Sequence, residues 1–333
     1  MAGSPAFLVT HPIPETGMTA LRSAGRVHVP TDPFSPADLY SACSSGEFDV
    51  VVAQLSDRFD STILGDAKVT GISNYAVGYD NVDVDAATRN NIVVGNTPGV
   101  LTDATADLTM LLILAAARRA IEADHFTRSG HWTGWKPELL LGHDVSGATL
   151  GLAGFGRIAR ATATRAAAFG MNIIFCSHPP AGRTLSDADV AALPFPARQV
   201  TWPELVETSD FLSVHVPLAN STRHLIDGTV LAAMKPTAIL INTARGPVID
   251  EAALVAALRD GSLAAAGLDV YENEPLLAPG LADLTNAVLV PHLGSATVRV
   301  RNRMADLCAA NAIAIAAGHL PPHCVNPEAW PPR

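Results

Sequence analysis

Residues 149–170, TLGLAGFGRIARATATRAAAFG, carry the clearest fold information in the chain. The apolar run at residues 149–153 predicts a buried strand, and the pattern over residues 157–169 predicts a helix. Between them Gly154, Gly156 and Ala159 form a G-x-G-x-x-A pattern. Gly154 permits a tight turn, Gly156 lets a pyrophosphate approach the backbone, and a small residue at position 159 allows close packing. This context predicts a dinucleotide-binding turn; in isolation the pattern could be a packing turn.

Five more short apolar runs follow, and polar residues stand where each of them ends. The runs are residues 172–176, 211–214, 238–241, 264–268 and 287–290, and the residues after them include Ser177, His215, Thr243, Arg245, Asp269 and His292. Helical patterns, such as residues 251–260, separate most of these runs, which is typical of a parallel sheet. Ligands bind outside the carboxyl ends of such strands. We therefore expect Arg245, Asp269 and His292 around one crevice, with His215 and Thr243 as cofactor-binding candidates.

The first hundred residues predict a second sheet. Strand-like runs occupy residues 6–10, 49–54, 69–74 and 92–96, with an amphipathic helix over residues 19–24. A length of 333 residues also favours two domains. The fold class is therefore α/β with two parallel-sheet domains. After residue 295 the sequence predicts a helix and a Pro-rich tail that return to the first domain.

The region between the two predicted sheets is expected to be packed. A helix over about residues 102–119 is apolar around most of its circumference, so it should lie buried between layers or subunits. Residues 129–143, which include Trp132 and Trp135, have no regular pattern and predict an irregular, packed connection.

Composition narrows the class of partner. The formal net charge is -10, and no long basic run is present, which argues against nucleic acid and anionic membranes as partners. The three lysines are Lys68, Lys136 and Lys235, so an anion pocket must use arginine, histidine and backbone N–H groups.

The cysteines and the apolar segments indicate the compartment. The four cysteines are far apart, without a C-x-x-C pair, so we expect reduced thiols and no metal site. The N-terminal residues lack the basic region of a signal peptide. The apolar segment at residues 108–117 is shorter than the ~20 residues of a membrane-spanning helix. We therefore expect a cytoplasmic protein without membrane partners.

The end of the second strand after the glycine-rich turn bears on cofactor choice. NAD sites usually carry Asp or Glu there, to bind the ribose 2′-OH. This chain has Ser177, followed by His178 and Arg183, which could pair with a 2′-phosphate. The pattern favours NADP(H) over NAD(H). The alternative is that these are ordinary loop residues and both cofactors are used.

Five ordered motifs resemble the D-isomer-specific 2-hydroxyacid dehydrogenases, and are most similar to the glyoxylate/hydroxypyruvate reductase branch. They are YAVGYDNVDVDAATRNNIVVGNTPGVLTDATADL (75–108), LGLAGFGRIA (150–159), INTARGPVIDE (241–251), AGLDVYENEP (266–275) and VLVPHLGSAT (288–297). The resemblance covers about residues 10–316. Ala159 replaces the commoner third glycine and Ser177 the acidic residue of NAD-dependent members, and both departures concern cofactor choice.

The resemblance implies a domain arrangement and an activity. Residues 1–100 with 296–333 would form a flavodoxin-like substrate-binding domain, and residues 101–295 a Rossmann dinucleotide-binding domain, with the active site in the interdomain cleft. The implied reaction is reduction of a small 2-keto acid, glyoxylate or hydroxypyruvate, to the D-2-hydroxy acid. A homodimer is implied, with residues 103–119 and the Trp-containing connection at its interface.

The chemistry of keto-acid reduction matches three residues of the motifs. Arg245 can bind the substrate carboxylate with its guanidinium fork and polarise the keto oxygen. His292 can donate the proton, because imidazole titrates near neutrality, and the nicotinamide supplies the hydride. Glu274 can orient the imidazole and support its charged form. Singly, each could be a surface, salt-bridge or turn residue; the joint match favours the catalytic assignment.

Further residues are assigned by resemblance. Val77 and Gly78 lie in a tight turn whose N–H groups can bind the substrate carboxylate, or which is only structural. Asp269 would hold the nicotinamide carboxamide or ribose, or serve only as a structural carboxylate. The remaining cofactor-binding candidates are Thr105, Arg157, Ile158, Pro217, Thr222, His292, in addition to its catalytic role, and Gly294.

Other activities stay open on the sequence alone. Within the same family they are D-lactate-type, phosphoglycerate-type and formate- or phosphite-oxidising enzymes. Asn96 is a candidate for the Asn of a formate pocket, but Leu293 and Gly294 after His292 follow the keto-acid pattern. A different class is a non-enzymatic, dinucleotide-sensing corepressor on the same fold, which the presence of Arg245, Glu274 and His292 disfavours.

Overall fold

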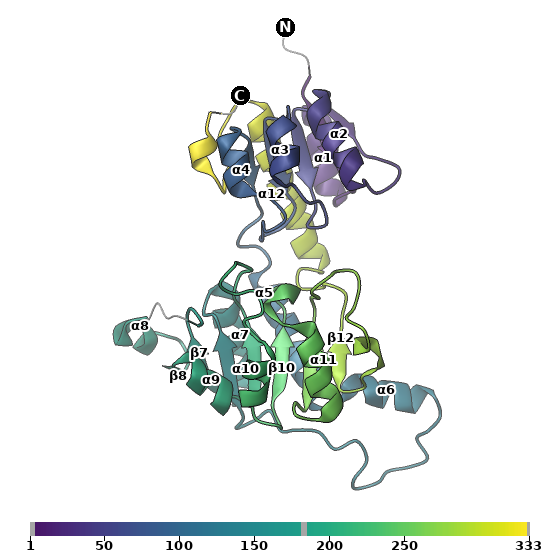
Figure 1. Cartoon of the computed structure of the whole chain (residues 1–333), viewed down its shortest axis with the longest axis vertical. Helices are drawn as coiled ribbons and strands as arrows, with labels where there is room; N and C mark the ends of the chain where they lie inside the picture. Colours follow the sequence, from purple (N-terminus) through teal and green to yellow (C-terminus); the bar gives the residue numbers. More distant parts are fainter. Residues whose placement is uncertain (1–3, 181–184, 332–333) are drawn as a thin grey trace. The chain divides into compact units, whose positions relative to one another are not determined.

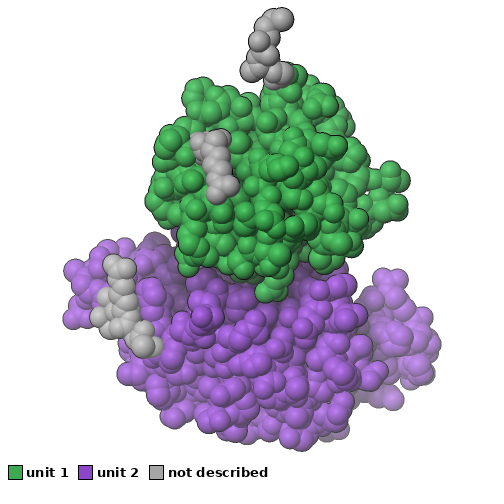
Figure 2. All heavy atoms as spheres, turned by 45° about the horizontal axis from the view of Figure 1, so that its top comes forward, with its two compact units in different colours: residues 1–101, 296–333 green, residues 102–295 purple. Residues whose placement is uncertain are grey.

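The computed structural model describes residues 4–180 and 185–331. The chain divides into two compact units, Met1–Leu101 with Ala296–Arg333, and Thr102–Ser295 (Figure 2). Each unit contains one parallel sheet, of five strands in the first and seven in the second. The predicted α/β class with two parallel-sheet domains is confirmed.

The sheet of the first unit has the order β2-β1-β3-β4-β5, which is the flavodoxin-like order. Its strands are β1 (Ala6–Val9), β2 (Arg26–His28), β3 (Val50–Ala53), β4 (Gly71–Asn74) and β5 (Val93–Gly95). Successive strand residues point to opposite faces. Ile72 therefore joins one apolar cluster, while the hydroxyl of Ser73 donates to the carbonyl of Cys308 on the other face, at 2.8 Å.

Helices cover both faces of this sheet (Figure 1). On the Ile72 face lie α2 (Pro36–Ser45), α3 (Ser61–Asp66) and α4 (Val84–Arg89). On the Ser73 face lie α1 (Glu15–Ala24) and α12 (Val298–Ala316). The helix α1 begins four residues before the predicted segment, directly after Pro14.

The C-terminal tail adds to the β5 edge of the sheet. Cys324 forms an antiparallel bridge with Gly95, and the N–H of Val325 donates to the carbonyl of Val94 at 2.7 Å. The buried amide of Asn326 accepts from the N–H of Val94 at 2.8 Å and donates to the carbonyl of Ile92 at 3.0 Å. The short 3-10 helix Pro327–Ala329 follows. The edge is therefore satisfied by the chain's own end.

The sheet of the second unit has the order β12-β11-β10-β9-β6-β7-β8. Counted from β6, this is the Rossmann order with one extra strand. The strands are β6 (Thr149–Ala153), β7 (Asn172–Cys176), β8 (Ala197–Gln199), β9 (Phe211–Val214), β10 (Ile239–Asn242), β11 (Ala265–Leu268) and β12 (Ala287–Leu289). The chain reverses direction across the sheet between β6 and β9, where open sheets of this type form their binding crevice.

Two apolar cores lie on the two faces of this sheet. One packs α5 (Thr102–Ala117) and α7 (Arg157–Ala168) against side chains such as Leu152 and Ile241. The other packs α9 (Trp202–Thr208), α10 (Gly228–Ala233) and α11 (Glu251–Asp260) against side chains such as Leu240. The remaining helical elements are α6 (Ala120–Arg128), α8 (Asp187–Ala191) and the 3-10 helices Gly246–Val248 and Leu281–Asp283.

The packed connection expected at residues 129–143 is wrong for the single chain. These residues are irregular, but Trp132 and Trp135 are 57% and 83% exposed. The predicted single helix also ends early, because α5 stops at Ala117 and Arg119, with φ 51°, begins α6. No residue of α6 is buried.

The helix α5 itself is largely buried, with one exposed stripe. Asp103, Asp107 and Leu111 form that stripe, and Arg165 of α7 donates to both aspartates.

Among the described residues, no helix is long and apolar enough to cross a membrane. The expected cytoplasmic location stays a prediction.

Candidate active site

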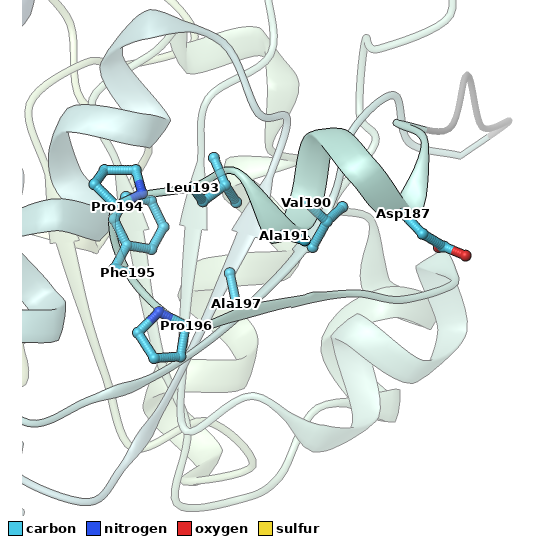
Figure 3. Close-up of a pocket in the computed structure, with 8 residues that line it drawn as sticks. All are labelled: Asp187, Val190, Ala191, Leu193, Pro194, Phe195, Pro196 and Ala197. Atoms are coloured by element: carbon cyan, nitrogen blue, oxygen red, sulfur yellow. The ribbon is translucent and has the colours of Figure 1, made fainter.

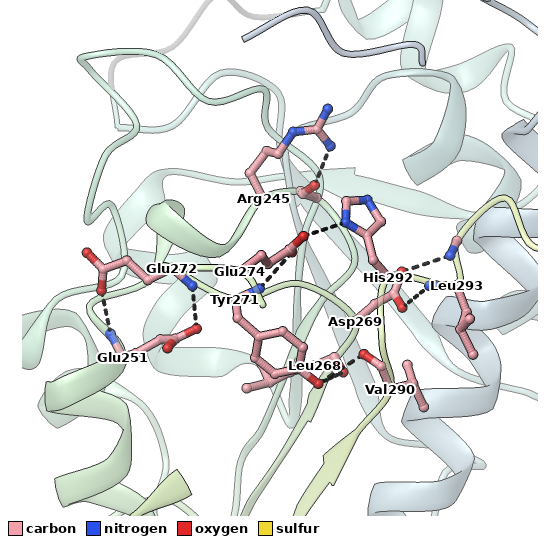
Figure 4. Close-up of polar contacts among 12 residues, drawn as sticks. Arg245, Glu251, Leu268, Asp269, Tyr271, Glu272, Glu274, Val290, His292 and Leu293 are labelled. Carbon is pink, nitrogen blue, oxygen red and sulfur yellow. Dashed lines mark hydrogen bonds and ion pairs between the residues drawn. The ribbon is translucent and has the colours of Figure 1, made fainter. Parts of the chain in front are cut away.

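Three neighbouring strands of the second unit present the candidate catalytic residues. Arg245 follows β10, Asp269 follows β11 and His292 follows β12, and β10, β11 and β12 are adjacent in the sheet. Because the strands are parallel, their carboxyl ends meet at one edge. Figure 4 shows Arg245, Glu274 and His292 grouped above that edge.

His292 and Glu274 form a hydrogen-bonded pair. The imidazole Nδ1 lies 2.8 Å from Oε2 of Glu274, and the other carboxylate oxygen accepts the N–H of Tyr271 at 3.0 Å. Burial raises the pKa of Glu274, but the hydrogen bond and charge of His292 outweigh it, so the pKa lies below its ordinary value. Glu274 is therefore an anion that fixes Nδ1 and leaves Nε2 as the nitrogen for chemistry.

The backbone holds His292 in a tight turn. Its φ is 55°, in the left-handed region, and its N–H donates to the carbonyl of Asp269 at 2.8 Å. The carboxylate of Asp269 accepts the N–H groups of Leu293 at 2.5 Å and Gly294 at 2.8 Å (Figure 4). Burial raises the pKa of Asp269, and these two N–H groups oppose that rise. Asp269 thus fixes the turn that carries His292, and its contact with a cofactor stays a prediction.

Arg245 is held close to the Glu274 loop by a glycine. A Cβ on Gly246 would overlap the carbonyl of Tyr271, so only glycine lets these two strand-end loops pack this closely. The guanidinium of Arg245 donates to the carbonyl of Ala244 at 2.8 Å. Its charge also contributes to holding the pKa of Glu274 below its ordinary value.

Tyr271 is a supporting residue that the sequence did not single out. Besides its N–H bond to Glu274, its hydroxyl donates to the carbonyl of Val290 at 2.9 Å, so it joins the Glu274 loop to the end of β12. Burial raises the pKa of this hydroxyl to about 12. Tyr271 lies within the motif at residues 266–275, three residues before Glu274, so its place in that motif could have indicated a supporting role.

The glycine-rich turn connects β6 to α7. Gly154 has φ 95°, and a Cβ there would lie 2.7 Å from the carbonyl oxygen of His215. Gly156 is the N-cap of α7, and a Cβ there would meet nothing within 4 Å. The open space beside Gly156 lies at the helix N-terminus formed by Arg157 and Ile158, where N–H groups and the helix dipole favour a pyrophosphate. The turn therefore fits a dinucleotide.

These two glycines give a matched pair of variants. We expect Gly154→Ala to lower stability by about 2 kcal/mol, since it forces a side chain into a left-handed conformation against backbone. The thermal midpoint should fall by about 4 °C or more. Gly156→Val meets open space at an extended backbone, so it should lower the midpoint less than Gly154→Ala, through the weaker N-cap alone, and should weaken NADPH binding at least ~tenfold by filling the phosphate space. Calorimetry and a fluorescence titration with NADPH measure the two effects. Equal destabilisation by both variants would contradict this division of roles.

Several cofactor candidates make hydrogen bonds that join the elements around the turn. The hydroxyl of Thr105 donates to the carbonyl of Gly294 at 2.9 Å, and Thr243 lies 2.9 Å from the hydroxyl of Thr109. These bonds tie the start of α5 to the ends of β12 and β10. They show positions next to the site and leave the cofactor roles as predictions.

The candidates after β9 lie next to the glycine-rich turn. His215 is hydrogen-bonded to Ser213 at 2.9 Å, and burial lowers its pKa to about 4. It is therefore neutral at physiological pH. Thr222 closes the next loop by donating to the carbonyl of Pro217 at 2.7 Å.

The residues expected to select the nucleotide follow β7, beside β6. Ser177 donates to Oε1 of Gln199 at 3.4 Å, and the same oxygen accepts the N–H of Leu185 at 2.9 Å. His178 comes next in the chain, and Arg183 lies outside the described residues. Ser177 therefore occupies the position at the end of β7 where NAD sites usually carry the Asp or Glu that binds the ribose 2′-OH.

Val77 and Gly78 belong to the first unit, in the turn after β4. The side chain of Asn96, the candidate for a formate pocket, donates to the carbonyl of Val77 at 2.8 Å. It supports this turn, and the role of the turn in substrate binding stays a prediction.

A separate pocket lies beside α8, with a volume of about 640 Å³ (Figure 3). It is lined mainly by apolar side chains of residues 187–197, such as Val190, Leu193 and Phe195. None of the candidate site residues lines it. In residues 4–180 and 185–331, no cluster of three potential metal ligands occurs.

A Rossmann-ordered sheet with a glycine-rich turn and an arginine and a histidine–glutamate pair at its strand ends defines a nicotinamide-dependent oxidoreductase domain. A family model described as "D-isomer specific 2-hydroxyacid dehydrogenase, NAD binding domain" matches residues 110–294. The chain belongs to the D-isomer-specific 2-hydroxyacid dehydrogenases.

Relatives and solved structures agree on the branch. The glyoxylate reductase of Thermococcus litoralis is 45% identical over 329 residues, with 97% of each chain covered. A glyoxylate reductase structure from Paecilomyes thermophila has a TM-score of 0.84 at 36% identity, covering 97% of this chain and 99% of that one. An NADPH-dependent glyoxylate/hydroxypyruvate reductase from Sinorhizobium meliloti, solved with NADP and malonate, has a TM-score of 0.85 at 33% identity, covering 99% of both. The predicted resemblance is confirmed, and the protein is an NAD(P)-dependent dehydrogenase of this family.

Proposed function

We propose that this enzyme reduces glyoxylate or hydroxypyruvate to the corresponding D-2-hydroxy acid. The observation that carries the proposal is the His292–Glu274 pair beside Arg245 at the strand ends of the dinucleotide-binding unit. The similarity to glyoxylate reductases over 97% of the chain supports the substrate class.

The residues divide the work as follows. A nicotinamide cofactor held at the turn of Gly154 and Gly156 would supply the hydride for the keto carbon. Arg245 binds the carboxylate and polarises the keto oxygen with its planar fork. As the carbonyl becomes an alkoxide, Nε2 of His292 donates a proton to it. The Nδ1–H group of His292 remains hydrogen-bonded to the carboxylate of Glu274. The anionic Glu274 stabilises the imidazolium before this transfer. Val77 and Gly78 bind the substrate carboxylate with their N–H groups.

The test is turnover with a panel of 2-keto acids. NADPH and NADH oxidation is measured with glyoxylate, hydroxypyruvate and pyruvate. We expect glyoxylate and hydroxypyruvate to give the higher kcat/KM. A preference for pyruvate would indicate a D-lactate-type enzyme. Tight NADPH binding without turnover on any of the three would contradict the proposal.

We further propose that NADP(H) is preferred over NAD(H). Ser177 places no negative charge at the end of β7, so a 2′-phosphate meets no repulsion there. His178 and Arg183 are the residues proposed to pair with that phosphate. The Sinorhizobium meliloti relative is NADPH-dependent.

Ser177→Asp tests this preference. The new carboxylate should accept the ribose 2′-OH of NADH and repel the 2′-phosphate of NADPH, which lowers kcat/KM for NADPH by about tenfold or more relative to NADH. Ser186→Asp is the control, because Ser186 caps α8 and aspartate caps helices equally well. A native chain that already favours NADH would refute the proposal.

We also propose a homodimer whose interface comprises the predicted residues 103–119 and the Trp-containing connection, extended to the whole segment of residues 120–143. The exposed apolar side chains of this segment are Ile121, Trp132, Trp135 and Leu141. Their exposed fractions are 57%, 57%, 83% and 65%. Interfaces are enriched in large aromatic and aliphatic side chains, and α6, at the start of this segment, projects from the rest of its unit (Figure 1).

Sedimentation velocity at micromolar concentration should show a dimer. Trp135→Asp should shift it toward monomer, because a charge would be buried in the interface. Val298→Asp is the matched control, since Val298 is 81% exposed and begins α12, where an acidic residue is well tolerated. A monomer-sized native protein would refute the dimer.

A further inference from the structure

In the turn after β4, the backbone carbonyl groups all accept hydrogen bonds, whereas two of the backbone N–H groups donate to none of the described residues. The carbonyl of Ala76 accepts the N–H of Thr97 at 2.8 Å, that of Val77 accepts the side chain of Asn96 at 2.8 Å, and that of Gly78 accepts the side chain of Asn74 at 2.9 Å. All three successive carbonyls are therefore occupied. The N–H groups of Val77 and Gly78 donate to none of the described residues 4–180 and 185–331.

Asparagine side chains make two of these three contacts. Asn74, at the end of β4, is fully buried and pairs reciprocally with the amide of Asn81, at 3.1 and 3.2 Å. Asn81 in turn donates to the carbonyls of Gln54 and Asp57, both at 3.0 Å, which anchors it to the end of β3. Asn96, after β5, is half-buried. Its backbone carbonyl accepts a hydrogen bond from the side-chain amide of Asn311 in α12, at 2.8 Å. Each amide is fixed by the strands around it.

A peptide group whose carbonyl is held on one side presents the following N–H on the other. Partly buried N–H groups without a partner are rare, because an unmet donor costs free energy. Two consecutive donors of this kind form a concavity suited to an anion, as in other backbone nests. A carboxylate has the charge and the two acceptor oxygens that such a pair can bind.

We propose that Asn96 and Asn74, the latter supported by Asn81, are positioning residues that hold this turn with the N–H groups of Val77 and Gly78 facing the substrate carboxylate: Asn96 orients the Val77–Gly78 peptide and Asn74 fixes the carbonyl of Gly78. They act on substrate affinity through the turn and touch neither the reacting carbon nor the cofactor. This inference rests on the proposed reduction of a 2-keto acid and assigns the residues that shape its carboxylate site.

The test compares Asn96→Ala and Asn74→Ala with the native chain. Loss of one positioning hydrogen bond should raise the KM for glyoxylate about fivefold to tenfold, with kcat and the KM for NADPH little changed. The Kd for oxalate, a small carboxylate probe, measured by calorimetry with NADPH present, should rise by the same factor. Because Asn96 is half-buried, Asn96→Ala remains informative even if Asn74→Ala does not fold.

Asn326→Ala is the matched control. Asn326 is a buried amide of the same unit that makes hydrogen bonds to Val94, Ile92 and Thr88 and none to the turn. It should lower the thermal midpoint without changing the KM for glyoxylate or the Kd for oxalate.

The outcomes separate the two proposals. Unchanged glyoxylate KM and oxalate Kd in a folded Asn96→Ala overturn the positioning role, and so does an equal rise in Asn326→Ala. A native chain without keto-acid turnover refutes the proposed function, and weaker oxalate binding in Asn96→Ala would then still support the anion site.

Discussion

His292→Ala is expected to lower kcat by about 10²- to 10⁴-fold, the usual contribution of a positioned general acid. The variant removes the Nε2 proton donor, so the alkoxide must take its proton from water. The KM for NADPH should change little. Steady-state kinetics with glyoxylate measure both values.

His224→Ala is the matched control for this prediction. His224 also pairs with a carboxylate of the same unit, with Nε2 2.6 Å from Oε1 of Glu272. If the fall in kcat came only from losing a histidine–glutamate pair, both variants would lose kcat to the same extent. If His292→Ala retained native kcat, or if His224→Ala lost as much, the assignment of the proton donor to His292 would be wrong.

Arg245→Ala should damage both substrate binding and catalysis. The guanidinium is proposed to bind the carboxylate in the ground state and the developing alkoxide in the transition state, so KM for the keto acid rises and kcat falls. Removing one such electrostatic donor typically costs about 10²- to 10³-fold in kcat.

Arg245→Lys separates charge from geometry. Lysine keeps the charge but cannot make the planar, bidentate contact, so we expect it to recover only a small part of the loss. Arg198→Ala is the control, since Arg198 forms an exposed ion pair with Glu204. Full activity of Arg245→Lys would show that a point charge suffices.

Much of the fold could be predicted because the strands of the second unit are buried on both faces. Such strands are continuous apolar runs, and the bounds of β6, β7 and β9 agree with the predicted runs. The strands β2 and β8 were not predicted. Each has three residues at a sheet edge, exposed or half-buried, so their sequences RVH and ARQ carry no apolar pattern.

The site was predictable to the extent that its residues follow strands. Arg245 and His292 stand at strand ends, and parallel topology alone brings those ends together. What the sequence could not give is which groups the side chains contact. Asp269 accepts two backbone N–H groups of the His292 turn, and Asn96 holds the carbonyl of Val77. Both contacts depend on loop conformations that no periodicity encodes.

The C-terminal tail on β5 and the helix α12 on β3, β4 and β5 have a consequence for biosynthesis. The unit Thr102–Ser295 is continuous in the chain, so all of its residues are available once Ser295 has left the ribosome. The first unit must wait for its last helix, although residues 4–101 are translated before the second unit. At ordinary translation rates that delay lasts on the order of ten seconds or more. Throughout it, the strands β3, β4 and β5 lack the cover of α12 and the tail, and apolar strands exposed in this way are prone to aggregate.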